Sequence, residues 1–196
     1  MSVKTVFGCD MKHAAQNFVA ANWSDRVGHF FEQMASITTG GGTCTLHHAQ
    51  CRVPQGAVID CMITGMPCQP WSRQRGDKQK VPPKQHDGCA ATFTDFFEIL
   101  DSEIMSIQGG ISEQVMGFAD KLNQSQDEEA LEGHESPFRL FLSRLHSRGF
   151  RTTTLRVNMT AWINEPPRER LYIIWVSDVL GGKEALQWME KTYQET

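Results

Sequence analysis

A short apolar run followed by a proline-rich turn constrains the fold of this chain more than any other feature. Residues 57–64 are apolar enough to predict a short buried strand, and the octapeptide Gly-Met-Pro-Cys-Gln-Pro-Trp-Ser follows at 65–72. Cys68 is therefore expected just past the carboxyl end of a strand, in a turn stiffened by Pro67 and Pro70. Ligands and catalytic groups of open α/β sheets lie at that edge. The pattern indicates a candidate nucleophile at the functional edge of an α/β fold.

Cysteines are most often small packing residues, and Cys9 and Cys61 fit that role. Cys68 does not fit it, because its neighbours are glycine, prolines and polar residues rather than an apolar pattern. Arg73 and Arg75 follow closely, and nearby cations favour the reactive thiolate form of a cysteine. We therefore treat Cys68 separately from the other cysteines.

Strands and helices are expected to alternate along the chain. Apolar spacing predicts strands at 3–9, 57–64, 110–115, 151–157 and 171–177, and helices at 12–22, 90–105, 137–147 and 183–193. The polar, glycine-rich segments 38–56 and 73–88 are expected to be loops. This alternation predicts one domain of class α/β, with a mostly parallel sheet covered on both faces.

Composition limits the environment and the partners. The net charge is −4, which is not typical of a free-standing nucleic-acid binder. Basic side chains gather at 73–84 and 139–156. The first group lies beside Cys68 in the sequence and could contact phosphates, although a polar loop explains it almost as well. We expect no membrane span and no secretory leader. Six irregularly spaced cysteines favour a reducing, intracellular setting, nuclear if the source is eukaryotic.

A histidine and cysteine cluster suggests metal binding but lacks a familiar spacing. Cys44, His47, His48 and Cys51 lie close together along the chain. Zinc sites normally combine pairs such as C-x2-C and H-x3-H, and this segment contains neither. From the spacing alone we expect no metal site.

Four segments together resemble a known enzyme family. Residues 65–72 resemble the G-x-P-C-Q-x-x-S nucleophile motif of the cytosine carbon-5 DNA methyltransferases, and all five defined positions match. Ser112-Glu113-Gln114-Val115 resembles the family's E-N-V segment, with Gln114 in place of asparagine. Residues 166–170 resemble its Q-x-R-x-R segment, with Pro166 in place of glutamine. Residues 6–15 resemble the strand end and helix start that hold the cofactor. The resemblance extends over roughly residues 3–178.

The resemblance implies roles for the catalytic residues. Cys68 would attack carbon 6 of a cytosine extruded from its duplex. Glu113 would act at ring N3, and Arg168 and Arg170 would hold the base carbonyl and a phosphate. Glu169, between the two arginines, is expected to be an ordinary surface charge.

The resemblance also implies S-adenosylmethionine as cofactor and DNA, or alternatively RNA, as partner. Asp10 would accept hydrogen bonds from the ribose, Met11 would lie near the adenine, and Glu32 is a weaker candidate for an adenine contact. The cofactor-binding set is Asp10, Met11, Glu32 and Pro67, and the nucleic-acid-binding set is Gln69, Ser72, Arg73 and Arg75.

Two parts of the family pattern are not found in this sequence. They are the glycine-rich F-x-G-x-G motif with its strand, which would precede Val3, and the target-recognition region. We therefore expect a Rossmann-like S-adenosylmethionine-dependent methyltransferase sheet that is incomplete at its N-terminal central strand. The strands at 3–9 and 57–64 would then expose open edges or pair with each other.

Three interpretations stay open at this point. The chain is a fragment of a DNA methyltransferase, one half of a split enzyme whose partner chain supplies the first strand, or a non-catalytic descendant that binds nucleic acid or protein. Pro70-Trp71-Ser72 loosely resembles the P-F-T sequence of the family's tRNA-methylating branch, which keeps tRNA as an alternative substrate.

Overall fold

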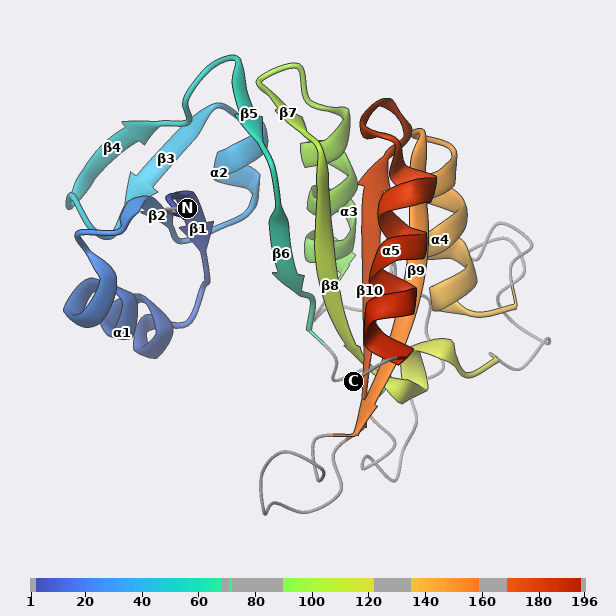
Figure 1. Cartoon of the computed structure of the whole chain (residues 1–196). Coiled ribbons are helices and arrows are strands. Elements are labelled where there is room, and N and C mark those ends of the chain that lie inside the picture. The colour runs from blue at the N-terminus through green and yellow to red at the C-terminus, as the bar shows by residue number, and fades with distance from the viewer. Residues whose placement is uncertain (1–2, 68–70, 72–89, 122–134, 159–168, 195–196) are drawn as a thin grey trace. The chain divides into compact units, whose positions relative to one another are not determined.

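The structure is a computed structural model that describes residues 3–67, 71, 90–121, 135–158 and 169–194 (Figure 1). The chain divides into two compact units. Unit 1 contains Met1–Ile59 and Thr94–Ile107, and unit 2 contains Asp60–Phe93 and Gln108–Thr196. The helix α3, Ala90–Asp101, belongs to both units by sequence.

Unit 1 is built on a four-stranded sheet of short strands in the order β1-β2-β3-β4. The strands are β1 Thr5–Cys9, β2 Val27–Phe31, β3 Gly41–Cys44 and β4 Ala49–Arg52. Helix α1, His13–Trp23, connects the parallel pair β1 and β2, whereas β3 and β4 form an antiparallel hairpin. Gly28 allows the close approach of β1 and β2, because a Cβ there would lie 2.6 Å from the carbonyl oxygen of Val6. The short helix α2, Ala35–Thr38, precedes the hairpin.

A second, two-stranded sheet completes unit 1. Strand β5, Ala57–Ile59, pairs in parallel with β7, Met105–Ile107. The backbone of Gly56 also donates to the carbonyl of Ile104, so this pairing extends beyond the two strands.

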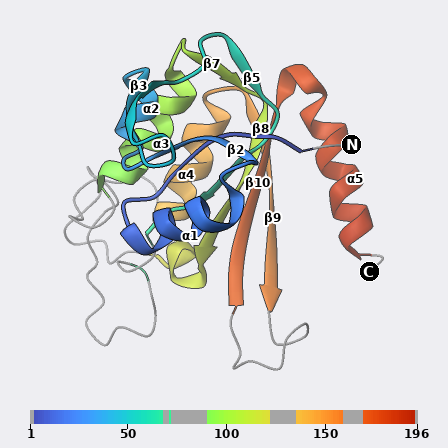
Figure 2. The same ribbon diagram turned by 90° about the vertical axis from the view of Figure 1, so that its left-hand side faces the viewer.

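Unit 2 is built on a four-stranded sheet in the order β6-β8-β10-β9. The strands are β6 Met62–Gly65, β8 Gly109–Val115, β9 Phe150–Asn158 and β10 Glu169–Ser177. The pair β6 and β8 is parallel, and β10 runs antiparallel to both β8 and β9. Helices α4, Pro137–His146, and α5, Gly182–Gln194, lie on opposite sides of this sheet (Figure 2). Two short 3-10 helices, η3 Met116–Ala119 and η5 Asp178–Leu180, follow β8 and β10.

The core of unit 2 gathers around alternate residues of β10. Leu171, Ile173 and Trp175 are all buried, as the two-residue period of a strand requires. A side chain at Gly110 would collide with the Trp175 ring and with the carbonyl of Met62, so glycine allows this strand contact. Apolar burial of this kind is the main favourable contribution to folding.

Most of the elements expected from the sequence are confirmed, with shifted ends. The prediction of a loop over 38–56 is wrong, since that segment contains α2, β3 and β4. The expected strand at 57–64 is interrupted at Asp60 and Cys61, and its halves join different sheets. Helix α3 ends at Asp101, before the expected end at 105, and Met105 begins strand β7. Neither β7 nor β2 is among the strands expected from the sequence. Cys61 is exposed, contrary to the packing role expected for it.

The fold class α/β is confirmed, but parallel pairing does not dominate. The pairs β1/β2, β5/β7 and β6/β8 are parallel, and the pairs that involve β10 or β3 are antiparallel. Strands β1 and β6 each end a sheet, and among the described strands they do not pair with each other. On β6, the Ile63 side chain is 80% exposed. None of the helices in the described ranges has the length and apolar character needed to cross a membrane.

Candidate active site

Three consecutive residues of β8 hold the segment that leads into the Cys68 motif. The hydroxyls of Ser112 and Thr64 lie 2.9 Å apart. Glu113 is the register partner of Gly65, and the Gln114 side chain donates to the carbonyl of Met66 at 3.1 Å. Gln114 is fully buried, so this hydrogen bond forms away from water, where it is worth most. Three consecutive residues of β8 therefore fix the position of the segment 64–66, which directly precedes Pro67.

Glu113 and Arg170 form an ion pair beside this segment. The Nε atom of Arg170 lies 2.6 Å from Oε1 of Glu113, and the two side chains are 16% and 40% exposed, respectively. The second carboxylate oxygen, Oε2, lies 3.7 Å from the position that a Cβ would take at Gly65. A side chain at this position would begin in van der Waals contact with Oε2, so glycine leaves the space next to it unfilled. Arg170 also donates to the carbonyl of Glu169, which further fixes its guanidinium group.

Trp71 anchors the chain on the other side of Cys68. It is buried, and its ring meets the ring of Phe118 edge-on with centroids 4.8 Å apart. Phe118 belongs to η3, which directly follows β8. The hydrogen bond to Met66 and the ring contact of Trp71 thus hold the chain on both sides of the motif cysteine.

The candidate cofactor residues of unit 1 follow two neighbouring strands. Asp10 comes directly after β1 and Glu32 directly after β2, and the last residues of these strands, Cys9 and Phe31, are register partners. The backbone N–H of Asp10 donates to the carbonyl of Phe31 at 3.2 Å. The structure therefore places the two carboxylates at the same sheet edge, which is where nucleotides bind in such folds.

The conformation of Asp10 is fixed by local hydrogen bonds. Its Oδ1 accepts from the backbone N–H of Lys12 at 2.8 Å, and its carbonyl accepts from the Gln16 side chain at 2.8 Å. A carboxylate has about four acceptor positions, so Asp10 retains capacity for ribose hydroxyls. Met11 is 76% exposed beside it. A carboxylate with free acceptor positions and an exposed methionine side chain thus lie next to each other after β1.

Several predicted site residues lie outside the described residues. These are Cys68, Gln69, Ser72, Arg73, Arg75 and Arg168. Of the catalytic set, the structure brings Glu113 and Arg170 together, and Pro67 is half-buried at the end of the anchored segment. Glu169 forms an exposed ion pair with Arg156 at 2.8 Å, in agreement with its expected surface role.

Sequence reasoning did not assign a role to Gln114 or Trp71. In the sequence, Gln114 is only a departure from the asparagine of E-N-V, and Trp71 is only part of the tripeptide that resembles P-F-T. A buried amide two residues before a 3-10 helix has no distinctive sequence pattern, so only the contact with Met66 identifies it as a positioning residue.

No protein-family model matches this sequence, and no curated protein matches it. Solved structures do match. A crystal structure of a triple mutant of Spodoptera frugiperda DNMT2 is similar with a TM-score of 0.53 and 16% identity, over 90% of this chain and 44% of that one. The S. pombe Dnmt2 methyltransferase gives a TM-score of 0.48 at 12% identity, over 90% and 42%. The Entamoeba histolytica methyltransferase EhMeth gives 0.46 at 12% identity, over 90% and 53%.

The chain thus spans about half of the length of these proteins. At such identities a structural likeness establishes the fold and no more. The likeness to the Spodoptera structure extends over 90% of this chain with a TM-score of 0.53. The chain therefore has the mixed α/β, Rossmann-like fold of the S-adenosylmethionine-dependent methyltransferases.

Proposed function

We propose that this chain is part of a DNA cytosine-5 methyltransferase that uses S-adenosylmethionine. The observation that carries the proposal is the Glu113–Arg170 ion pair, held 2.6 Å apart beside the anchored segment that leads into Gly-Met-Pro-Cys-Gln-Pro-Trp-Ser. A carboxylate and a guanidinium group beside the segment that leads into a cysteine motif suit covalent chemistry on a pyrimidine. A binding module would have no chemical need for this combination.

In the proposed reaction, Cys68 is the nucleophile. Its thiolate forms a bond to carbon 6 of the cytosine, the C5–C6 π bond breaks, and the electron pair is delocalised toward N3 and C5. Glu113, oriented by Arg170, hydrogen-bonds the N3 and N4 edge of the ring, where the charge develops. After carbon 5 has been methylated, its proton passes to water and the electron pair of the C–H bond re-forms the C5–C6 π bond. The S–C6 bond then breaks and regenerates the thiolate.

The cofactor would be held from unit 1. Asp10 would accept from the ribose hydroxyls, and Met11 and Glu32 would contact the adenine. When bound, S-adenosylmethionine supplies the methyl group.

Open strand edges support a role for a second chain in this activity. Strands β1 and β6 each end a sheet, and open edges accept a further strand. We propose that a strand carrying a glycine-rich turn, from a partner chain or from another part of a longer protein, pairs with β6. The exposed Ile63 of β6 would be covered by such a strand.

tRNA is the second candidate substrate. The observation that favours it is the Pro-Trp-Ser sequence at 70–72, which loosely resembles the P-F-T sequence of the family's tRNA-methylating branch. The similar Spodoptera structure is a DNMT2 protein. The chemistry at carbon 6 is the same for both substrates, so the experiment must vary the nucleic acid.

Trapping with 5-fluorocytosine tests the proposal. Duplex DNA and tRNA that contain 5-fluorocytosine are incubated with the chain, S-adenosylmethionine and a peptide that contains an F-x-G-x-G turn. Fluorine blocks proton loss from carbon 5, so the covalent adduct should accumulate and be visible by denaturing electrophoresis. We expect an adduct with the native chain and none with Cys68→Ser, and the nucleic acid that gives it identifies the substrate.

Cys61→Ser is the matched control, because it removes an exposed thiol near the motif and should leave the adduct unchanged. An adduct that persists in Cys68→Ser would refute the assignment of the nucleophile. Nucleic-acid binding that Cys68→Ala leaves intact, with no adduct under any condition, would favour the non-catalytic interpretation.

A further inference from the structure

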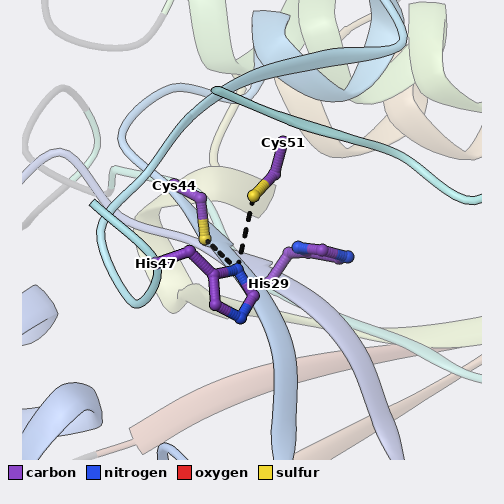
Figure 3. Close-up of side chains that lie close together, drawn as sticks. All are labelled: His29, Cys44, His47 and Cys51. Carbon is purple, nitrogen blue, oxygen red and sulfur yellow. Dashed lines mark hydrogen bonds between the residues drawn. The ribbon is translucent and has the colours of Figure 1, made fainter. Parts of the chain in front are cut away.

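Four potential metal ligands converge in unit 1, away from the residues discussed above (Figure 3). They come from β2, from the two strands of the β3–β4 hairpin and from the turn between them. They are His29, Cys44, His47 and Cys51, and one ligand atom from each lies within 4.8 Å of all the others. Two of the shorter separations are Nδ1 of His47 to Sγ of Cys44, at 3.4 Å, and to Sγ of Cys51, at 3.3 Å.

These separations match those in a tetrahedral zinc site. With Zn–S near 2.3 Å and Zn–N near 2.0–2.1 Å, sulfur and nitrogen ligands at the tetrahedral angle lie about 3.5 Å apart. Two thiolates and two neutral imidazoles form a ligand set that zinc prefers, and two thiolates balance the charge of Zn²⁺. The arrangement thus agrees with zinc in ligand type, ligand number and spacing.

His29 provides an independent observation. Its Nδ1 atom is buried, and within the described ranges it has no hydrogen-bond partner. Buried polar atoms are normally satisfied, and an exception calls for an explanation such as an ion. The His29 ring lies against the His47 ring, with centroids 5.2 Å apart. A metal bound at this point would satisfy the buried nitrogen.

We propose that His29, Cys44, His47 and Cys51 bind one Zn²⁺ in a closed, structural site. The two thiols each lose a proton when the metal binds, and no ligand position is left for a substrate. The spacing of Cys44, His47, His48 and Cys51 along the sequence matches no familiar zinc pattern, which is why the sequence predicts no metal site. That spacing could not include His29, which lies on a separate strand.

The site has a mechanical role in unit 1. Strands β2 and β3 share one register pair, Phe31 and Cys44, supplemented by the backbone bond from Thr45 to Phe30. A metal shared by β2, β3 and β4 would fasten the hairpin to β2. Glu32 follows β2 directly, so the metal would also stabilise the edge that carries the candidate cofactor residues.

Metal analysis of the full chain tests this proposal. The chain is produced with zinc, freed of loosely bound metal by gel filtration, and analysed by mass spectrometry of the metal. We expect about one Zn²⁺ per chain, with a near-complete loss in His47→Ala and in Cys51→Ser. His48→Asn is the matched control, because His48 is adjacent to His47 but outside the cluster, and asparagine tolerates its positive φ of 49°.

Two further measurements distinguish a lost ligand from a misfolded chain. His47→Cys conserves a four-ligand set and should retain the metal. In the native chain, Co²⁺ alone should replace Zn²⁺ and give the intense visible bands and thiolate charge-transfer absorption of a tetrahedral sulfur-containing site. Cys44 and Cys51 should resist alkylation until a chelator is added, whereas exposed Cys61 should react throughout.

Two results would overturn the proposal. One is a native chain whose zinc content equals that of Cys51→Ser, with alkylation of Cys44 and Cys51 that a chelator does not change. The other is a mass lower by two hydrogens that a reductant restores, which would show a disulfide between Cys44 and Cys51 instead.

Discussion

The two units hold their functional residues by different means. In unit 2, Glu113 and Arg170 lie on long strands whose sheet includes two strands of nine residues and a buried Trp175. In unit 1, Asp10 and Glu32 follow strands of five residues, and the hairpin beyond them meets β2 at one register pair. Packing therefore suffices to orient the candidate catalytic groups, whereas the cofactor edge depends on local hydrogen bonds and, in our proposal, on a metal.

The largest expected effect concerns the core of unit 2. Trp175→Ala should lower the free energy of unfolding by about 3–5 kcal/mol, because it removes a fully buried ring and the hydrogen bond of its indole N–H to Ser112. Urea denaturation followed by circular dichroism measures the loss. Trp188→Ala, at a residue that is 68% exposed, should cost no more than about 0.5 kcal/mol. Equal losses of stability in the two variants would mean that burial of Trp175 does not stabilise unit 2 as proposed.

The next effect concerns Cys9, one of the three cysteines of unit 1. Burial, together with the carboxylates of Asp10 and Asp95, raises the pKa of Cys9 from 9.0 to about 11. Two pKa units leave about 100-fold less thiolate at neutral pH, so iodoacetamide should alkylate Cys9 about 100-fold more slowly in the folded chain than in denaturant. Peptide mass spectrometry against time measures both rates.

The same pKa shift has a consequence for stability. The folded state disfavours the thiolate, so the contribution of Cys9 is fully present below the unfolded pKa of about 9 and is lost as the pH rises toward 11. Cys9→Ala should reduce this alkaline loss. Similar rates of Cys9 alkylation in folded and denatured chains would show that the fold of unit 1 does not shield this thiol.

A smaller effect is expected at the positioning residue Gln114. Gln114→Leu keeps the size of the side chain but leaves the carbonyl of Met66 without its donor, at a cost of about 1–3 kcal/mol. Gln50→Leu is the matched control in unit 1, because Gln50 donates to Thr43 from an exposed position and should change stability by about 0.5 kcal/mol or less. Thermal unfolding of both variants tests whether buried polar contacts distinguish the units.

The smallest effect concerns the Glu113–Arg170 pair. A double-mutant cycle with Glu113→Gln and Arg170→Gln should give a coupling energy of about 1 kcal/mol, since the arginine is mostly shielded. The same cycle on Arg151 and Asp178, a more exposed pair in the same unit, should give a smaller and more salt-dependent coupling. Indistinguishable couplings would indicate that the candidate catalytic pair is held no better than a surface pair.

Local patterns predicted the parts of the molecule where one feature determines the structure. The strand that carries Glu113 and the position of Asp10 after β1 both followed from apolar runs next to polar motif residues. The hairpin of β3 and β4 has strands of only four residues each. Two residues of β3 are glycines and β4 is mostly exposed, so neither strand shows the alternation of apolar and polar residues that predicts a strand.

Longer-range choices could not be predicted from such patterns. The apolar run at 57–64 does not reveal that its first half pairs with β7 and its second half with β8. The relation of His29 to Cys44, fifteen residues later, is set by the pairing of β2 with β3, which no local spacing encodes. The role of Gln114 likewise depends on a partner 48 positions distant.

Strand β8 determines how much variation this half of the molecule can tolerate in length. Successive side chains of a strand point to opposite faces, so the insertion or deletion of a single residue before Ser112 would exchange the faces of Ser112, Glu113 and Gln114 together. A point substitution at one of these positions would remove the contacts of that residue alone. An insertion or deletion of one residue would disrupt the contacts of all three residues. We therefore expect natural variants of this protein to differ in sequence along β8 but to conserve its residue count between Gly109 and Val115.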